Sequence, residues 1–378
     1  MLLVAQVAFV GALWGTERTV LPLIAKSEFG IASATSTLSF ILAFGLTKAP
    51  ANFVAGRLAD RFGRRRLLLG GWLLGLPVPL LIAFAPSWSW VIVANLLLGA
   101  QQGICWSTSI FMKVDVSGKQ RSGLAVGINE FAGYGGTAVL AYASGAIAAS
   151  MGPRVAPFLL GEAFVLAGLA TAWWLGQQTL FSLQPPRYDP SPAIPGTRFA
   201  FGGLCQAGFV VKLGDTLVWG LLPTYFHAHG LPVATVAVLA AAYPASWAVL
   251  QPFTGAASDR FGRRGAIISG MLVQAVGLGI VALSSGFGGW LAGLILLGAG
   301  TALTYPVLIA AAGDTALLHA SRIGHYRFWR DMGFVAGALL IGQLSDRLGT
   351  STALHILMLV PLASGVLVAV ALSRRGRE

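Results

Sequence analysis

Long apolar runs recur along the whole chain, and short stretches rich in glycine, proline or charged residues separate them. Each run is close to the roughly 20 residues that a helix needs to cross a bilayer core of about 30 Å. Unpaired backbone groups are too costly in lipid, so every run is expected to be α-helical. The pattern predicts twelve transmembrane helices, over residues 2–25, 34–56, 67–86, 89–113, 122–149, 155–178, 199–227, 233–256, 265–284, 288–313, 325–344 and 351–373.

The segment between the sixth and seventh predicted spans differs from its surroundings. It reads LFSLQPPRYDPSPAIPG over residues 180–196 and contains five prolines. Proline cannot propagate a helix and favours extended backbone. We therefore predict an all-α membrane protein with an N-terminal six-helix bundle over residues 1–178, a cytoplasmic linker over 179–198 and a C-terminal six-helix bundle over 199–378.

The composition supports a membrane protein. The 378 residues are 56% hydrophobic and only 10% charged, and the mean hydropathy is +0.76. Soluble domains carry about 25% charged residues, so most of this surface is not built to face water. The 49 glycines suit helices that approach one another closely within a bilayer. The first apolar run is expected to be a span and not a cleaved signal.

The basic residues predict the topology. With a cytoplasmic N-terminus, nineteen of the 25 Lys and Arg residues fall in cytoplasmic loops, linker or tail, counting Lys113, Arg327 and Arg330 among them. The outer loops hold three, and this asymmetry satisfies the positive-inside rule with both termini cytoplasmic. It also accounts for the net charge of +12, so no nucleic-acid partner is expected. The outer three are Lys26, Arg154 and Arg347.

One charged phrase occurs twice, as GRLADRFGRRR at residues 56–66 and GAASDRFGRRG at 255–265. Its pair of glycines seven residues apart recurs in GQLSDRLG at 342–349 and in GAIAASMG at 145–152, at the ends of spans 11 and 5. The acidic residue is kept in three copies, as Asp60, Asp259 and Asp346, whereas the span-5 copy has Ala149. This pattern predicts a three-helix unit used four times with alternating orientation.

The pattern Gly-x-x-x-Asp-Arg-x-Gly-Arg-Arg between spans 2 and 3, echoed between spans 8 and 9, resembles the signature loop of the major facilitator superfamily (MFS). With twelve spans and a central linker, the resemblance covers essentially the whole chain. It implies two six-helix bundles around a central cavity that opens alternately to either side. It also implies that spans 1, 4, 7 and 10 line this cavity, with 2, 5, 8 and 11 beside it.

The signature loops are candidates for a conformational latch. The resemblance implies that Asp60 contacts the start of span 11, and symmetry places Asp259 against the start of span 5. A carboxylate at a helix N-terminus stabilises it by about 0.3–1 kcal/mol when exposed. The alternative is that the arginines only fix the topology. The candidate latch residues are Gly56, Asp60, Arg61, Gly63, Arg64, Gly255, Asp259, Arg260, Gly262, Arg263, Arg330 and Asp331.

At least five ionisable residues lie within predicted spans, where charges are costly and default to functional candidates. Span 1 holds Glu17 and Arg18, span 2 holds Lys48, and span 7 holds Lys212 and Asp215. The last two share a helical face and are able to neutralise each other. We hypothesise that Glu17 or Asp215 exchanges a proton while a cation contacts the substrate, with a static ion-pair lock as the alternative. The excess of cations favours an anionic substrate weakly.

Other polar residues of the spans complete the predicted substrate and proton cavity: Asn95, Gln102, Trp106, Glu130 and Tyr305. Proton-coupled drug exporters of this superfamily usually carry an arginine in span 4, where this chain has Gly99, and a proline in span 5, where GYGGTAVLAYASG has none. Both departures from the pattern of those exporters argue against a drug antiporter.

We therefore expect a monomeric secondary active transporter of the cytoplasmic (inner) membrane that moves a small solute, with protons as coupling partner. The alternatives are a multidrug/proton antiporter and, in another class, a non-transporting sensor or scaffold. No motif indicates an enzyme or a cofactor. Cys105 and Cys205 lie in apolar runs, and His227 and His229 near the outer end of span 7 are expected to be interfacial, so no metal site is predicted.

Overall fold

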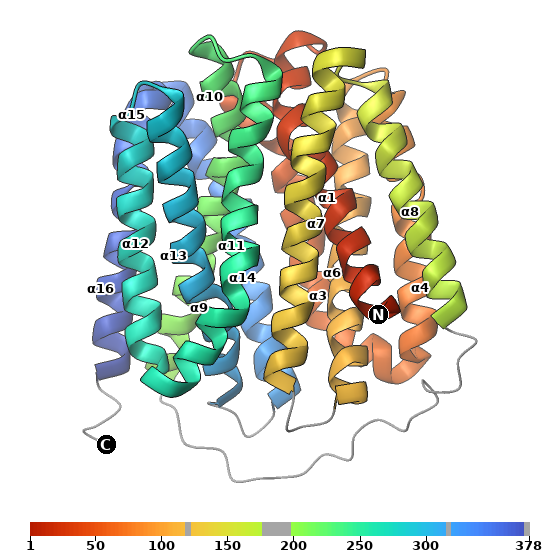
Figure 1. Cartoon of the computed structure of the whole chain (residues 1–378), viewed down its shortest axis with the longest axis vertical. Helices are drawn as coiled ribbons and strands as arrows, with labels where there is room; N and C mark the ends of the chain where they lie inside the picture. The colour runs from red at the N-terminus through yellow and green to blue at the C-terminus, as the bar shows by residue number, and fades with distance from the viewer. Residues whose placement is uncertain (118–121, 176–197, 315–318, 374–378) are drawn as a thin grey trace.

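The computed structural model describes residues 1–117, 122–175, 198–314 and 319–373, and these form a bundle of helices with no strand among them (Figure 1). Residues 179–197 of the predicted linker lie outside the described part. The first six predicted spans are confirmed as helical segments, which extend up to six residues past the predicted ends. They are α1 (Leu2–Ser27), α2 (Ala34–Thr37) with α3 (Ser39–Phe62), α4 (Arg64–Gly75) with α5 (Val78–Ala83), α6 (Trp88–Ser117), α7 (Ser122–Met151) and α8 (Val155–Leu175).

The last six predicted spans are helical as well. The seventh changes into a π-helical turn, η3, just before Pro223, a residue that has no backbone N–H to give to the preceding turn. The segments are α9 (Arg198–Thr216) with η3 (Leu217–Leu221) and α10 (Leu222–Ala228), α11 (Val233–Phe261), α12 (Arg263–Leu283), α13 (Phe287–Asp314), α14 (His319–Leu348), and α15 (Thr350–Leu357) with α16 (Leu359–Ser373).

Within the described residues, seven helical segments are long and apolar enough to cross a membrane by length and composition alone. The five spans outside that set contain α3, α6, α7, α9 and α14. Each of these five carries at least one buried charged side chain, for example Lys48 on α3 and Lys212 on α9. A charge is tolerated in a span when it faces the protein interior, so these helices are expected to face the centre.

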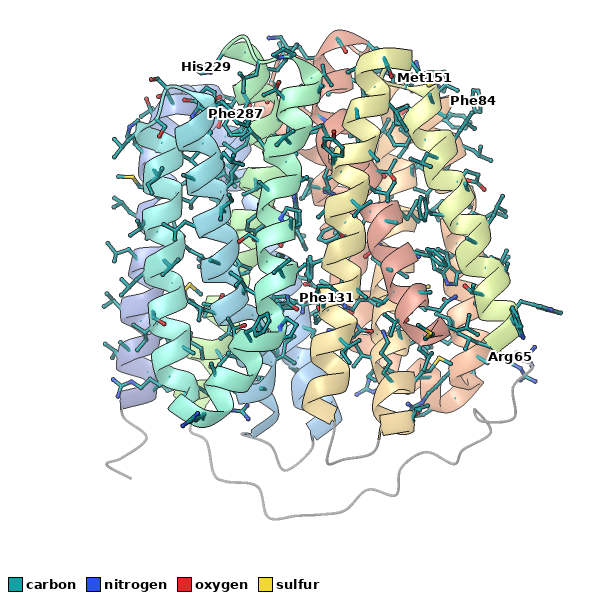
Figure 2. The ribbon with its side chains drawn as sticks, viewed as in Figure 1. Arg65, Phe84, Phe131, Met151, His229 and Phe287 are labelled. Carbon is teal, nitrogen blue, oxygen red and sulfur yellow. The ribbon has the colours of Figure 1, made fainter. Side chains whose placement is uncertain are left out.

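Apolar side chains cover the outside of the bundle (Figure 2). Phe131 points outward from the middle of α7, and Trp173 and Trp174 are exposed on α8. Arg65 marks one end of the bundle and His229 the other. An apolar belt with polar ends is the surface of a protein that sits in lipid.

The two halves of the chain, α1–α8 and α9–α16, meet along paired helices. α7 packs against α11, and α2 and α3 pack against α14, while α1 contacts η3 and α10. Figure 1 shows α7 and α11 side by side at the centre of the molecule. Spans 2, 5, 8 and 11 therefore form the walls between the halves, as the resemblance implies.

We name the two ends of the bundle by the chain segments that lie there. The last residues of α8, the first of α9 and the last of α16 lie at the lower end in Figure 1, which we call the linker end. The turns after α1 and α14 lie at the upper or opposite end.

The second glycine of all four sequence repeats has the same backbone conformation. The φ angle is 81° at Gly63, 91° at Gly262, 83° at Gly349 and 91° at Gly152. At the first three, ψ lies between 145° and 151°. A side chain would strain this region, so each position requires glycine. The four copies therefore share a positive-φ glycine, including the span-5 copy that lacks an acidic residue, and the three-helix repeat itself stays a prediction.

Three basic residues counted with the cytoplasmic loops lie elsewhere. Arg327 and Arg330 are buried in α14, and Lys113 is buried in α6. The sequence assigned them to loops because each lies near the predicted end of an apolar run. Without these three, the basic residues that remain in excess at the linker end are chiefly the arginines of the two signature loops.

Candidate functional site

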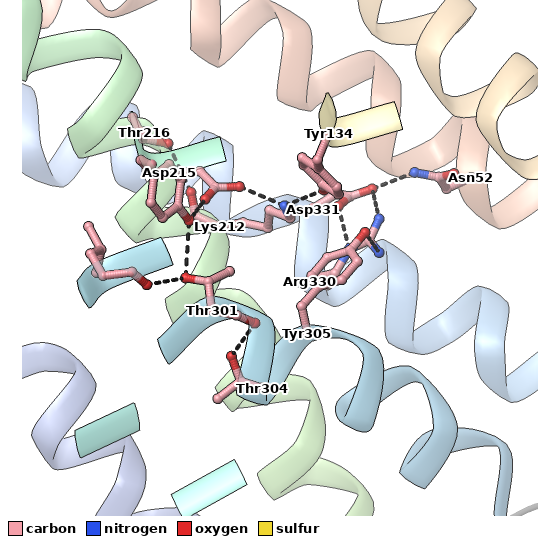
Figure 3. A network of polar contacts seen from close by, with 12 residues as sticks. Asn52, Tyr134, Lys212, Asp215, Thr216, Thr301, Thr304, Tyr305, Arg330 and Asp331 are labelled. Carbon is pink, nitrogen blue, oxygen red and sulfur yellow. Dashed lines mark hydrogen bonds and ion pairs between the residues drawn. The ribbon is translucent and has the colours of Figure 1, made fainter. Parts of the chain in front are cut away.

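A buried ion pair connects four helices of the interior. The Lys212 Nζ on α9 donates to Asp215 Oδ2 at 2.6 Å and to the Tyr134 hydroxyl of α7 at 3.2 Å. Asp215 Oδ1 accepts a second hydrogen bond, at 2.5 Å, from the Tyr243 hydroxyl of α11, and that hydroxyl lies 3.2 Å from Thr301 Oγ1 on α13 (Figure 3). The predicted pairing of Lys212 with Asp215 is confirmed. Both carboxylate oxygens of Asp215 are thus occupied.

A second buried pair lies on α14. Arg330 holds Asp331 with two hydrogen bonds, Nε to Oδ1 at 2.6 Å and Nη2 to Oδ2 at 2.9 Å, and its Nη1 donates to the Tyr305 hydroxyl at 2.9 Å. Asp331 also accepts from the Asn52 amide of α3, so the pair bridges the two halves (Figure 3). Ser107 on α6 donates to Asn52 Oδ1 at 2.8 Å.

Arg330 and Asp331 were predicted to belong to the latch near the loops. The structure places both in the interior, 2% and 0% exposed. α14 begins at His319, six residues before the predicted start of that span, so Arg330 and Asp331 lie about three turns into the helix and away from its end.

The third group lies in the N-terminal half and is paired far less well. Arg18 and Glu17 approach at 3.6 Å between Nη2 and Oε2, too long for a hydrogen bond. Arg18 makes one long hydrogen bond, from Nε to the Trp14 carbonyl at 3.3 Å. Among the described residues, neither oxygen of Glu17 has a hydrogen-bond partner, and neither does Arg18 Nη1 or Nη2. All of these atoms are buried.

Lys48 on α3 completes this group. Its side chain is 5% exposed, and no hydrogen bond or ion pair joins it to a described residue. Four aromatic rings surround its Nζ, at 4.5 Å from Trp14, 4.8 Å from Phe44, 5.5 Å from Phe334 and 5.8 Å from Trp106, measured to the ring centroids. These distances are in the range of cation–π attraction.

Shared aromatic rings show that the groups form one site. Phe334 lies 5.5 Å from Lys48 Nζ and 5.5 Å from Lys212 Nζ. Tyr305 lies 4.7 Å from Lys212 Nζ and 5.3 Å from the Arg330 guanidinium. We call this cluster the charged core; it consists of Glu17, Arg18, Lys48, Lys212, Asp215, Arg330 and Asp331.

Glu130 borders the charged core on α7. Its Oε1 accepts from Trp106 Nε1 at 2.7 Å and from Asn129 Nδ2 at 3.1 Å, and Lys113 Nζ donates to Asn129 Oδ1 at 2.6 Å. Tyr134, one turn further along α7, contacts Lys212. Trp106, Glu130 and Tyr305 thus lie beside the charged core, as the sequence analysis expected.

Asn95 lies beside Glu17 of the charged core, and Gln102 contacts α1. The Asn95 amide donates to the Val91 carbonyl of its own helix at 3.1 Å, and the Gln102 amide donates to the Val10 carbonyl of α1 at 2.7 Å. Both side chains are fully buried. Their contacts join α6 to itself and to α1, so the hydrogen bonds observed here serve helix packing in the N-terminal half.

Aromatic rings from the two halves meet across the centre. Trp14 contacts Trp219 edge to face at a centroid distance of 4.6 Å, and Tyr134 stacks on Trp247 at 3.5 Å. Phe334 lies 5.4 Å from Phe44. The sequence did not indicate this aromatic seam, because the pattern of an apolar span does not distinguish an aromatic residue that faces lipid from one that faces the partner half.

The repeated motif makes a contact between the halves at the opposite end. Asp346 on α14 accepts hydrogen bonds from Ser33 Oγ at 2.7 Å, the Ala34 N–H at 2.6 Å and the Thr35 N–H at 3.0 Å. Gly342 lies against Thr35, and a Cβ added to it would stand 2.6 Å from the Thr35 Cα. Asp346 therefore caps the start of α2, across the boundary between the halves.

At the linker end the motif is arranged differently. Asp60 is exposed, and no described residue hydrogen-bonds or ion-pairs with it. Arg64 pairs instead with Asp115 at the end of α6, within the same half. The Asp259 side chain lies outside the described residues, so its predicted contact with span 5 stays a prediction, as does the latch role of Asp60.

The histidines near the opposite end bond only to backbone carbonyls: His227 Nδ1 lies 3.0 Å from the Leu231 oxygen and His229 Nδ1 lies 2.8 Å from the Tyr225 oxygen. Across the described parts of the chain, no group of three or more His, Cys, Asp or Glu residues is arranged to hold a metal ion.

Comparison with known proteins places these features in a family. The family model of the Major Facilitator Superfamily matches residues 3–202 and 204–378. An uncharacterized MFS-type transporter, YddS of Bacillus subtilis (strain 168), is 26% identical over 96% of this chain and 89% of its own length. The 3-(3-hydroxy-phenyl)propionate transporter of Escherichia coli (strain K12) is 26% identical over 87% of this chain and 82% of its own. NarK1 of Thermus thermophilus, named a probable nitrate/nitrite antiporter, is 29% identical over 63% and 56%.

Proposed function

The chain belongs to the major facilitator superfamily, and on that premise we propose that it is a secondary active transporter that moves a small anionic solute by alternating access, coupled to protons. One observation carries the proposal: the charged core is buried at the boundary between the halves, where only a separation of the halves would open it. Charges in a membrane interior are costly, and a transport pathway is their commonest use.

Glu17 is the group that we assign to proton coupling. Asp215 accepts hydrogen bonds from the Lys212 ammonium and the Tyr243 hydroxyl, so both of its oxygens already have a partner. The two oxygens of Glu17 have no hydrogen bond, and Arg18 is 3.6 Å away. A buried carboxylate without hydrogen bonds is costly in its charged form, which is the reason for assigning the proton to Glu17 and not to Asp215. When Arg18 changes its contacts during transport, Glu17 would take up or release a proton in response.

An anionic solute matches the charge of the site. Lys212 and Arg330 each have a hydrogen-bonded carboxylate, whereas Arg18 and Lys48 do not. The names of two relatives point the same way, since hydroxyphenylpropionate, nitrate and nitrite are all anions. This likeness supports the charge of the solute and not its identity.

We assign the repeated motifs to the closing of the two ends of the bundle. We assign Asp346 to a latch that holds the halves together at the opposite end, because it caps α2 of the other half. Asp60 would act at the linker end in the alternate conformation. Such contacts contribute about 0.3–1 kcal/mol when exposed, enough to shift a two-state equilibrium several-fold.

We also propose that the linker end faces the cytoplasm, so that both termini are cytoplasmic and the protein resides in the inner membrane as a monomer. Support comes from the signature-loop arginines at that end, among them Arg65 and Arg66, against Lys26, Arg154 and Arg347 at the other.

The experiment that tests this function is transport by the purified protein in liposomes with a pH-sensitive dye inside. Addition of an accepted anion is expected to move protons together with the solute. Solute movement that is indifferent to an imposed pH gradient would refute the coupling, and failure of every anion in a broad panel would refute the substrate class.

A multidrug/proton antiporter is the competing function, favoured by the aromatic seam, whose rings would suit lipophilic compounds. The excess of buried cations opposes the lipophilic cations that such exporters often carry. Adding a lipophilic cation to the same panel separates the two, since only an antiporter would export it. A sensor or scaffold would move none of these solutes.

A further inference from the structure

Two of the four cations of the charged core have no hydrogen-bonded carboxylate. The Arg18 guanidinium is 0% exposed, and Nη1 and Nη2 have no hydrogen bond. Lys48 is 5% exposed, and no described residue hydrogen-bonds or ion-pairs with it. By contrast, a carboxylate oxygen lies 2.6 Å from Lys212 Nζ and from Arg330 Nε. The four cations of the charged core therefore divide into two with a hydrogen-bonded carboxylate and two without one. Arg18 keeps its 3.6 Å ion pair with Glu17, but its Nη1 and Nη2 can still donate to a ligand.

The two available cations lie over the same aromatic rings. The Arg18 Cζ is 4.9 Å from the Trp14 centroid and 5.3 Å from that of Phe44, and the Lys48 Nζ is 4.5 Å and 4.8 Å from the same rings. Cation–π contacts offset part of the cost of burial but leave both charges in place. A carboxylate complements this pair, because the planar arginine fork binds two oxygens at once and the lysine adds a point charge.

The aromatic rings beside these two cations indicate the chemistry of the uncharged part of the ligand. Trp14 of the N-terminal half contacts Trp219 at 4.6 Å and Phe334 at 6.2 Å, both from the C-terminal half. When the halves separate, these contacts are lost and apolar ring faces are uncovered beside Arg18 and Lys48. A small inorganic anion would satisfy the charges but leave the rings bare. A planar ring attached to the anion would restore the lost aromatic contacts.

We propose that Arg18 and Lys48 bind the carboxylate of a small aromatic acid whose ring packs against Trp14 and Phe44 in place of Trp219 and Phe334. This rests on the proposed transport function, since the site opens only when the halves separate. The ligand is thus a monocarboxylate with a flat ring, and the specificity depends on both parts.

The test is calorimetric titration of the purified full-length protein with four probes: benzoate, cyclohexanecarboxylate, nitrate and benzyl alcohol. We expect benzoate to bind most tightly, with cyclohexanecarboxylate and nitrate each weaker and no detectable binding of benzyl alcohol. In Arg18→Gln the affinity for benzoate is expected to fall about tenfold or more, as for loss of a charge-assisted hydrogen bond. Nitrate binding as tight as benzoate would overturn the aromatic part of the proposal.

Two further variants keep the site testable if Arg18→Gln does not fold. Lys48→Gln should weaken the binding of benzoate, and Trp14→Leu should remove the preference of benzoate over cyclohexanecarboxylate. Arg154→Gln is the matched control, because Arg154 pairs with Glu28 at the surface. Benzoate affinity that is unchanged in Lys48→Gln and in every folded Arg18 variant would overturn the site.

Transport in liposomes separates this inference from the function on which it rests. Proton-coupled uptake of a non-aromatic anion without uptake of benzoate would overturn the aromatic-acid proposal and leave the transporter intact. Absence of proton-coupled uptake of any anion, with benzoate bound as expected, would overturn the proposed transport function and leave the binding site standing.

Discussion

Asp346 accepts a hydrogen bond of 2.6 Å from the backbone N–H of Ala34, 312 residues away in the sequence and in the other half of the molecule. The first prediction follows from this contact. Asp346→Asn removes the negative charge at the start of α2 and should let the halves part at the opposite end. A cysteine placed at Ala237, which is buried against Gly145 there, should then react faster with a maleimide. Both native cysteines are buried.

The control for this experiment is the neighbouring Arg347→Gln, which changes an exposed charge without touching α2. Asp60→Asn offers a second comparison, because Asp60 has no partner among the described residues. Equal labelling of Asp346→Asn and wild type would contradict the latch.

The same contact should depend on pH. Partial burial raises the pKa of Asp346, but hydrogen bonds from Thr35, Ser33 and Ala34 outweigh this effect, so its pKa lies below the ordinary value of 3.8. A lowered pKa means that the contact stabilises the folded protein fully above the ordinary value and is lost as pH falls through the lowered one. The melting temperature of wild type minus that of Asp346→Asn should be constant above about pH 5 and shrink below about pH 4. A difference independent of pH would show that the charge of Asp346 is not involved.

The pair Lys212–Asp215 should be sensitive to the loss of one partner. Lys212→Met leaves a buried carboxylate without its cation, which typically costs about 3–5 kcal/mol. The double variant Lys212→Met/Asp215→Asn has no unpaired charge and should recover most of that loss. Thermal unfolding in detergent measures both. If the double variant is no more stable than the single one, the pair does not act as a unit.

Glu17→Gln should uncouple transport from protons. Glutamine keeps the size of the side chain but cannot take up a proton, so exchange of the solute across liposomes should persist while proton movement with it disappears. Exchange and proton uptake are measured on the same preparation. Normal proton movement in Glu17→Gln would assign the coupling to another group, and Asp215 would be the next candidate.

Gly349→Ala should destabilise the protein through its backbone. Gly349 has φ 83° and ψ 151°, a conformation that costs a residue with a Cβ about 1–3 kcal/mol. Gly255 belongs to the same repeated motif but lies in α11 with no atom within 4 Å of an added Cβ, so Gly255→Ala is the matched control. Similar melting temperatures for the two variants would show that the left-handed turn is not strained by alanine.

Much of the architecture was predictable because it depends on local patterns. Twelve apolar runs specify twelve helical spans, since lipid forces the backbone of each to pair within itself. The glycine pairs specify four equivalent turns, since only glycine adopts the backbone found at Gly63, Gly152, Gly262 and Gly349. The charged residues within the spans were likewise recognisable as interior, because lipid does not tolerate them.

The roles within the site were not predictable to the same degree. Arg327 and Arg330 were assigned to a loop, yet α14 carries both into the interior. Asp346 was recognised as part of a repeat, but its partners Ser33 and Ala34 lie more than 300 residues away. The aromatic seam went unrecognised, since Trp14 and Trp219 have no pattern that distinguishes them from residues facing lipid.

The sequence by itself determined the membrane fold, its internal repeat and the set of charges placed in the interior, because hydropathy, glycine conformation and the cost of a charge in lipid act on each segment independently. Only the tertiary structure decided which charges are hydrogen-bonded to one another: Lys212 and Asp215 meet on one helical face, while Lys48 and Arg18, which is 3.6 Å from Glu17, lie against aromatic rings. Ion pairing and hydrogen bonding act over a few ångströms in space, and that distance is set by how helices from both halves pack together.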